Sequence, residues 1–173
     1  MLKKRPRGFT IVELLIVIVV IAILAAITIV AYNGVQTRAK NTKTINATTA
    51  WVKALKLYNA DTGLWPTVSS CFGSATTYQG SGGQCWNGTT WIVNSTFTSQ
   101  VQPYMNGTPE PDTTDIATTN SPRRGAFYQV NSTLRYIWMS LPGATSCPDL
   151  GMPLIGSGAE TNGMYCYYHL ATV

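Results

Sequence analysis

A long apolar run near the N-terminus limits what this chain can fold into. Residues 14 to 31 read LLIVIVVIAILAAITIVA, where Thr28 is the one residue that is not apolar, and no charged residue occurs between Glu13 and Arg38. An α-helix rises 1.5 Å per residue, so about 20 residues cross the roughly 30 Å hydrocarbon core of a bilayer. Lipid offers no partners to backbone polar groups, so the run is predicted to be a transmembrane helix.

The charges around this run predict its orientation. The 173 residues include 12 Lys and Arg against 7 Asp and Glu, a formal net charge of +5. Four of the basic residues precede the apolar run, at Lys3, Lys4, Arg5 and Arg7. The positive-inside rule then places the N-terminus in the cytoplasm and the residues after the run outside. Without these four residues the net charge is +1, so composition alone does not indicate a nucleic-acid-binding protein.

A secretory signal peptide also combines a basic segment with an apolar run. Three features weigh against it: the run is longer than an ordinary signal core, the following AYNGVQTRAK is a poor cleavage site, and Glu13 places a costly carboxylate at the membrane boundary. We therefore expect the helix to stay attached to the mature protein.

Residues 3 to 15, KKRPRGFTIVELL, resemble the class III leader junction of type IV prepilins and pseudopilins. The resemblance implies that a prepilin peptidase removes residues 1–8 by cutting between Gly8 and Phe9 on the cytoplasmic side. It also implies that the same enzyme N-methylates Phe9, and that the product is a filament subunit.

Glu13 matches the glutamate of that family, and its position has a physical reason. It lies one helical turn after Phe9, where free N–H groups and the helix dipole favour a carboxylate. In a filament, Glu13 of one subunit could also meet the α-ammonium of Phe9 in a neighbour, so that two costly buried charges neutralise each other. The alternative is a boundary carboxylate that reaches the lipid headgroups.

The helical pattern continues beyond the membrane run. Residues 36 to 60 place Ile45, Val52, Leu55 and Tyr58 or Asn59 along one stripe, which predicts an amphipathic helix. At its end, Gly63 can adopt the left-handed conformation that closes a helix, and Pro66 prevents its resumption. The segment from Tyr58 to Thr67 also resembles the helix exit of many pilins and pseudopilins.

This amphipathic helix carries a local charge of +5 without any acidic residue. Its basic residues form a possible contact face: Arg38, Lys40, Lys43, Lys53 and Lys56. A solvated helix surface is the ordinary interpretation. The alternatives are contact with DNA and contact with a neighbouring subunit, and residues 57 to 173 favour the latter because their net charge is −3.

The remainder of the chain is rich in Thr, Ser, Gly and Asn, with short segments of strand character. We predict strands at Thr89–Val93, Ala126–Val130, Thr133–Ser140 and Met164–Leu170, and loops at 69–88 and 106–125. An antiparallel sheet packed on the amphipathic helix gives an α+β fold, in agreement with the type IV pilin fold that the resemblance implies.

The four cysteines lie on the outer side of the predicted membrane segment, which favours two disulfides. Of three possible connectivities, local pairing of Cys71 with Cys85 and of Cys147 with Cys166 closes the shortest loops, each worth about 3 kcal/mol. The second pair also resembles the C-terminal disulfide loop of many pilins.

Signals for catalysis, cofactors or metals are weak. Asp112 and Asp115 could be a glycosidase pair, but they lie in a segment rich in Thr and Pro that predicts solvated turns. His169 lies in an aromatic strand and is expected to be structural. We expect neither a cofactor nor a zinc site. The aromatic residues, including Trp65, Trp86, Trp91 and Trp138, are expected to pack the core, with a sugar- or surface-binding platform as the alternative.

Together these observations predict a non-enzymatic subunit of a type IV pilus-like filament. After the leader, residues 9–35 would form the transmembrane and filament-core helix, 36–60 the amphipathic helix and 61–173 the head. The resemblance implies a membrane precursor that reaches the cell surface, and as partners other copies, other pilins, an inner-membrane platform protein and an assembly ATPase. A minor pilin or pseudopilin for adhesion, DNA uptake or type II secretion is the main alternative, and a membrane-anchored lectin or enzyme is the other.

Overall fold

The computed structural model describes residues 8–78, 83–86, 92–117 and 122–172. The chain forms two compact units, Met1–Gln36 and Thr37–Val173, and each is described by itself. Helix α1, Ile11–Thr62, contributes to both units. The leader cations Lys3, Lys4, Arg5 and Arg7 lie outside the described residues, as do Trp91 and the first part of the predicted strand Thr89–Val93.

The first unit is the beginning of α1 and has no core of its own among its described residues. Side chains from Ile11 to Ile29 are all exposed, at 85% for Ile11 and 62% for Ile29. By length and composition this part of the helix is able to cross a membrane. The helix begins at Ile11, two residues later than the expected start at Phe9.

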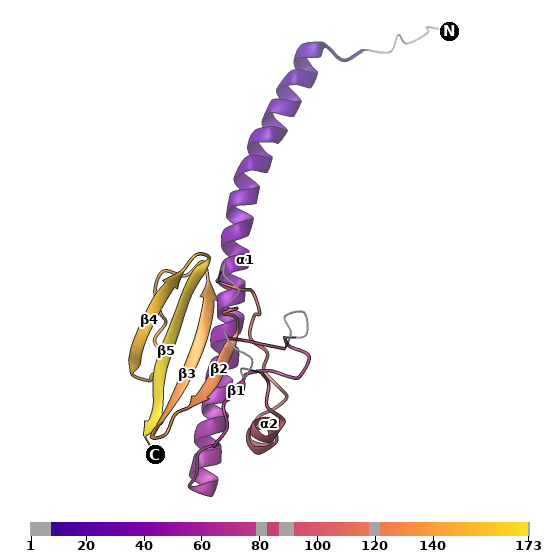
Figure 1. Ribbon diagram of the computed structural model, residues 1–173. Coiled ribbons are helices and arrows are strands. Elements are labelled where there is room, and N and C mark those ends of the chain that lie inside the picture. Colours follow the sequence, from indigo (N-terminus) through magenta and orange to yellow (C-terminus); the bar gives the residue numbers. More distant parts are fainter. Residues whose placement is uncertain (1–7, 79–82, 87–91, 118–121, 173) are drawn as a thin grey trace, which may run out of the picture. The chain divides into compact units, whose positions relative to one another are not determined.

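The second unit contains a five-stranded antiparallel sheet beside the second half of α1 (Figure 1). Its strands are β1 (Ser70–Cys71), β2 (Ala126–Val130), β3 (Leu134–Pro142), β4 (Leu154–Glu160) and β5 (Gly163–Thr172). The spatial order is β1-β2-β3-β5-β4, with every neighbouring pair antiparallel. The predicted α+β architecture, a long N-terminal helix followed by a small antiparallel sheet, is confirmed.

The core lies between α1 and the inner face of the sheet. From the helix, Trp51 and Leu55 are fully buried, and alternate strand residues such as Ile137 and Tyr168 meet them from the sheet. Trp51 stacks on Phe72 with ring centroids 5.1 Å apart, and its indole N–H donates to the carbonyl of Pro109 at 2.8 Å. This part of the helix is therefore an element of the head's own core.

Several elements differ from the predicted ones. The expected loop 69–88 contains β1, and Ile92, from the predicted strand Thr89–Val93, makes an isolated bridge with Gln84. The unpredicted elements are α2 (Ser95–Val101), the 3-10 helix η2 (Gln102–Tyr104) and the edge strand β4. Helix α2 forms because the side chain of Asn94 accepts from the N–H of Phe97 at 3.1 Å and because Phe97 and Val101 are buried.

Two disulfides cross-link segments within the head. They join Cys71 to Cys85 and Cys147 to Cys166, which are the local pairs that the short loop lengths favoured. The first ties β1 to the segment before Trp86, and the second ties the segment before β4 to β5. No described cysteine is free.

Candidate functional site

The peptide bond between Gly8 and Phe9 lies in the irregular segment directly before α1. Phe9 is 85% exposed, and the space around Gly8 is open to 4 Å. An exposed bond outside regular structure, flanked by a residue without a side chain, is accessible to a protease. The structure therefore presents this bond in a form that cleavage could use.

Thr10 and Glu13 form a reciprocal cap at the start of α1. The backbone N–H and the hydroxyl of Thr10 both donate to Oε2 of Glu13, at 2.9 Å and 2.8 Å. In return, Oγ1 of Thr10 accepts from the N–H of Glu13 at 3.2 Å. This arrangement is a capping box, which satisfies N–H groups that a helix start otherwise leaves without a partner.

The cap is a role for Glu13 that the sequence interpretation missed. The helix dipole and a neighbouring ammonium account for the carboxylate from its position alone, whereas the pattern Thr10-x-x-Glu13 before an apolar run is itself a capping-box signal. The geometry shows that one carboxylate oxygen already has two donors within its own chain, at the start of the apolar helix.

The C-terminal end of α1 has the structure that its residues predict. Gly63 has a φ of +71°, and its N–H donates to the carbonyl of Asn59 at 2.8 Å, which closes the last turn. Pro66 is buried, and its carbonyl accepts from the hydroxyl of Tyr128 at 2.9 Å. The helix exit is thereby fixed to β2 of the sheet.

The five basic residues of α1 do not share one face. At about 100° per residue, Arg38, Lys53 and Lys56 lie within about 60° of one another, whereas Lys43 and Lys40 lie about 140° and 160° from Arg38. Four of the five are exposed; Lys40 is half-buried and borders a hollow of about 710 Å³ with Glu160 and Asn162. Only Arg38, Lys53 and Lys56 form a common basic strip.

This basic strip runs along apolar surface. Lys53 and Lys56 border a shallow groove of about 340 Å³ with Val52, Leu57 and Leu150. Leu57 is 44% exposed although it is a large apolar residue. An apolar floor with cationic edges suits a partner surface that carries both apolar and acidic groups.

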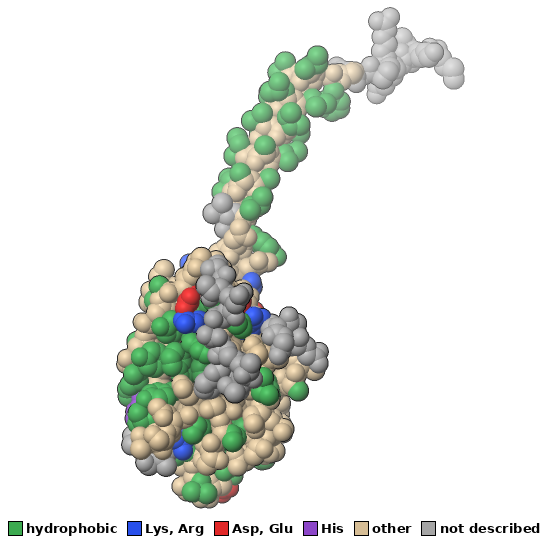
Figure 2. Space-filling model, viewed as in Figure 1, with side chains coloured by type: hydrophobic (Ala, Val, Ile, Leu, Met, Phe, Trp, Pro, Cys, Tyr) green, Lys and Arg blue, Asp and Glu red, His purple; other side chains and the backbone are tan. Residues whose placement is uncertain are grey.

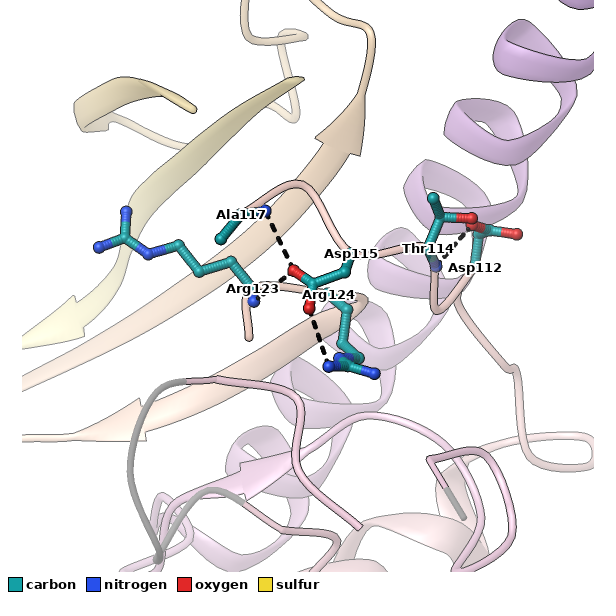
Figure 3. A network of polar contacts seen from close by, with 6 residues as sticks. All are labelled: Asp112, Thr114, Asp115, Ala117, Arg123 and Arg124. Carbon is teal, nitrogen blue, oxygen red and sulfur yellow. Dashed lines mark hydrogen bonds and ion pairs between the residues drawn. The ribbon is translucent and has the colours of Figure 1, made fainter. Parts of the chain in front are cut away.

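Asp112 and Asp115 accept hydrogen bonds from residues near them in the sequence of the head. Oδ1 of Asp115 accepts from the N–H groups of Ala117 and Arg123 at 3.0 Å and 2.9 Å, and its Oδ2 accepts from Arg124 at 2.8 Å (Figure 3). Asp112 accepts from the N–H of Thr114 at 3.0 Å. Asp112 therefore accepts within a local turn, and Asp115 accepts both from backbone N–H groups and from an ion-pair partner.

His169 belongs to no metal-binding cluster among the described residues. His169 is half-buried on β5, with its ring 6.3 Å from that of Tyr136. In the part of the chain that the structure describes, no three His, Cys, Asp or Glu side chains are grouped so that they could hold a metal ion.

Comparison with known proteins identifies a methylation motif in the N-terminal segment. Residues 3–29 match the family described as "Prokaryotic N-terminal methylation motif". The chain is 39% identical over 80 residues to the fimbrial protein EcpC of Eikenella corrodens, an alignment that covers 46% of this chain and 52% of the relative. No solved structure matches it significantly.

Two further relatives are a secretion-system protein and a major pilin. The type II secretion system core protein G of Aeromonas hydrophila is 34% identical over 68 residues, which is 39% of this chain and 48% of the relative. The type IV major pilin protein PilE of Neisseria gonorrhoeae is 35% identical over 69 residues, 40% of this chain and 41% of the relative. The chain thus spans about half the length, or less, of the curated relatives it matches.

The long N-terminal helix, the small antiparallel sheet and the methylation motif are consistent with the type IV pilin α+β fold, and the resemblance seen in the sequence is confirmed. More particularly, this chain has homologues among fimbrial proteins, major pilins and type II secretion core proteins.

Proposed function

We propose that the chain is a structural subunit of a type IV pilus-like filament rather than an enzyme. The observation that carries this proposal is the surface of the first unit, where every described side chain from Ile11 to Ile29 is exposed. So large a continuous apolar surface requires lipid or other protein around it. Lipid around a membrane precursor and neighbouring helices in a filament would each cover this surface. The methylation motif supports a maturation in which the chain lies first in the membrane and then in the filament.

The proposed maturation begins with the chain inserted and its N-terminus in the cytoplasm. A prepilin peptidase cuts the exposed Gly8–Phe9 bond and methylates the new α-amino group of Phe9. A platform protein and a cytoplasmic ATPase then extract the subunit into a filament at the cell surface. The accessible geometry of Gly8 and Phe9 supports the first step.

In the filament, Glu13 of one subunit would meet the Phe9 ammonium of a neighbour. The capping box supports this role because it holds Oε2 of Glu13 at a fixed place at the helix start. The pairing would compensate two charges inside an apolar helix bundle and would set the axial offset between subunits.

The decisive experiment is mass spectrometry of the mature N-terminus together with filament assays of Glu13→Gln. We expect an N-methylated Phe9 as the first residue, and a variant that inserts in the membrane but is absent from filaments. Glu110→Gln is a matched control, since Glu110 is an exposed head carboxylate that accepts from Ser74 at 2.6 Å. An intact Gly8–Phe9 bond, or normal assembly of Glu13→Gln, would refute the proposal.

A pseudopilin of a secretion system is the second candidate, because similarity to core protein G extends to three organisms: Aeromonas hydrophila, Dickeya chrysanthemi and Klebsiella pneumoniae. Quantitative mass spectrometry of sheared surface filaments separates the two. A major subunit dominates such a preparation, whereas a pseudopilin or minor pilin is a small fraction of it.

We also propose that the basic strip of Arg38, Lys53 and Lys56 contacts the acidic head of a neighbouring subunit. Asp149 is an exposed acid of the head that could supply the opposite charge. The rival partner for this strip is DNA. Binding of duplex DNA to the full chain, with a steep decrease at higher salt, would favour DNA over the neighbouring head.

A further inference from the structure

The hollow of about 710 Å³ beside Lys40 lies within the second unit. Its walls come from α1, from the turn after β3, from the turn between β4 and β5, and from the loop that contains Thr114. We call it the Lys40 hollow. Its lining includes five side chains with a hydroxyl or amide group: Thr37, Thr114, Thr145, Thr161 and Asn162.

Hydrogen bonds and close packing hold the walls of the Lys40 hollow in place. The N–H of Gly143 donates to the carbonyl of Asn162 at 2.8 Å, which joins the two turns. The side-chain amide of Asn41 donates to the carbonyl of Pro142 at 3.0 Å, which ties the turn after β3 to α1. A Cβ atom on Gly143 would lie 2.9 Å from Cγ2 of Thr37, so this turn packs directly on the helix. The hollow is therefore a preformed part of the head.

The head does not use the main donors that border this hollow. Among the described residues, the ammonium of Lys40 makes no hydrogen bond or ion pair, and the hydroxyls of Thr37 and Thr145 make no hydrogen bond. The carboxylate that borders the hollow, Glu160, is paired with Arg123. Figure 2 shows basic side chains next to acidic ones near one end of the second unit. The hollow thus offers an unpaired cation and free hydroxyls, while its acid is already neutralised.

Lys43 adds a second cation on the same side of α1. It follows Lys40 by three residues, so at 100° per residue the two lie about 60° apart around the helix. Both lie outside the basic strip defined above. Like charges at such a spacing repel each other and destabilise a helix, and α1 has no acidic residue from Leu14 to Ala60. A bound anion would relieve this repulsion.

The Lys40 hollow belongs to sequence that closely follows the apolar run. Thr37 comes six residues after Ala31, the last residue of that run. Six residues span at most about 22 Å. When the run crosses a bilayer, the hollow is therefore near the headgroups of the outer leaflet, where anionic phospholipids present their phosphates.

We propose that the Lys40 hollow binds the phosphoglycerol head of an anionic phospholipid. Lys40 and Lys43 pair with the phosphate through charge-assisted hydrogen bonds. The threonine hydroxyls and the amide of Asn162 bond to the hydroxyls of the glycerol. A carboxylate ligand would use the cations alone and would leave these neutral groups without partners. The proposal rests on the membrane precursor of the proposed function, and it names the lipid that holds the head at the membrane surface.

The test uses the full chain, isotopically labelled, in phosphatidylcholine nanodiscs with increasing fractions of phosphatidylglycerol. NMR measures the amide shifts of Thr145 and Asn162, and co-elution with the nanodiscs measures insertion separately. We expect saturable shifts. Phosphatidylserine has the same net charge but lacks the glycerol hydroxyls, so it should bind about fivefold more weakly. Lys40→Met keeps the length of the side chain but removes its charge, and it should weaken phosphatidylglycerol binding about tenfold.

Thr145→Val removes one exposed hydroxyl of the hollow and should weaken binding about threefold. It also provides a folded variant if Lys40→Met disturbs the packing around the half-buried lysine. Thr42→Val is the matched control. Thr42 is an exposed threonine of α1 that does not border the hollow and lies about 160° around the helix from Lys40. This control should bind the lipid as the wild type does.

Three results would overturn the proposal. Equal responses to phosphatidylglycerol and phosphatidylserine would show general charge attraction only. Normal binding by Lys40→Met and Thr145→Val would place the lipid elsewhere. Shifts caused by soluble glycerophosphoglycerol but not by the lipid would identify a free phosphodiester as the ligand. If the chain still inserts, each of these results leaves the filament proposal intact, whereas a chain that does not enter nanodiscs contradicts both proposals.

Discussion

The capping box makes a specific prediction for Thr10→Val. Valine has the shape of threonine but lacks the hydroxyl that donates to Glu13 Oε2 at 2.8 Å and accepts from the N–H of Glu13 at 3.2 Å. Loss of an N-cap side chain costs about 1 kcal/mol, which corresponds to roughly a fivefold increase in opening of the first turn. The Glu13 amide should show the largest change, because its hydrogen-bond acceptor is the missing oxygen.

Amide hydrogen exchange, monitored by NMR on the labelled chain in phosphocholine nanodiscs, measures this opening residue by residue. The Leu14 amide, which donates to the Thr10 carbonyl at 3.3 Å, should also exchange about fivefold faster because the first turn opens more often. Thr28→Val is the control. It removes a hydroxyl that donates to the Ala25 carbonyl at 2.9 Å in the middle of the same helix, and it should leave the first turn unchanged.

The same variant separates two roles of Glu13. Thr10→Val keeps the carboxylate and the Gly8–Phe9 bond, so filament incorporation should decline far less than in Glu13→Gln. Unchanged exchange at Glu13 would refute the capping argument. Equal loss of assembly in both variants would show that filament formation depends on the cap rather than on charge neutralisation.

Three further predictions concern the head. Burial raises the pKa of Tyr168 to about 12, against about 10 in an unfolded chain. Its contribution to stability is therefore complete below pH 10 and is lost as the pH rises further, by about 1 kcal/mol at pH 11. In alkaline denaturation, the free energy of unfolding of Tyr168→Phe should decrease less steeply with pH than that of the wild type. Replacing Cys71 and Cys85 together by alanine should lower the free energy of unfolding by about 3 kcal/mol, measured by chemical denaturation, because the disulfide closes a short loop; an unchanged value would contradict this. Gly156→Ala should destabilise the head by about 1–3 kcal/mol in thermal unfolding, since its methyl group would overlap the ring of Tyr167, and a more stable variant would show that the ring moves aside freely.

The sequence predicted those elements whose signals are local. The apolar run, the amphipathic stripe and the Gly63 exit each specify α1 through neighbouring residues. β2 and β3 are rich in aromatic and β-branched residues, so their propensity agrees with the sheet. The capping box was equally local and could have been recognised from Thr10 and Glu13.

The elements that were missed depend on partners far away in the chain. β4 reads LIGSGAE, and glycine is depleted in strands, so its composition suggests a loop. It becomes a strand because Tyr165 and Tyr167 of β5 cover Gly158 and Gly156. The seven residues of α2 are too few for a periodic signal, and that helix depends on burial of Phe97 against Trp51.

The burial pattern of α1 limits how a filament can use this helix. Thr44, Ala47, Thr48, Trp51 and Leu55 are buried by the chain's own head, and the N–H of Asp112 donates to Thr44 at 3.1 Å. Neighbouring subunits therefore cannot reach that side without taking the head apart. In the second half of the helix they can reach the opposite side, where Arg38, Lys53 and Lys56 lie near the exposed Leu57. Contacts in the first half can instead form all around the helix, since none of its described side chains is buried. A subunit with this pattern would pack through apolar contacts along residues 11–29 and through charge complementarity further along, so high salt should loosen contacts between heads while the apolar helix contacts persist.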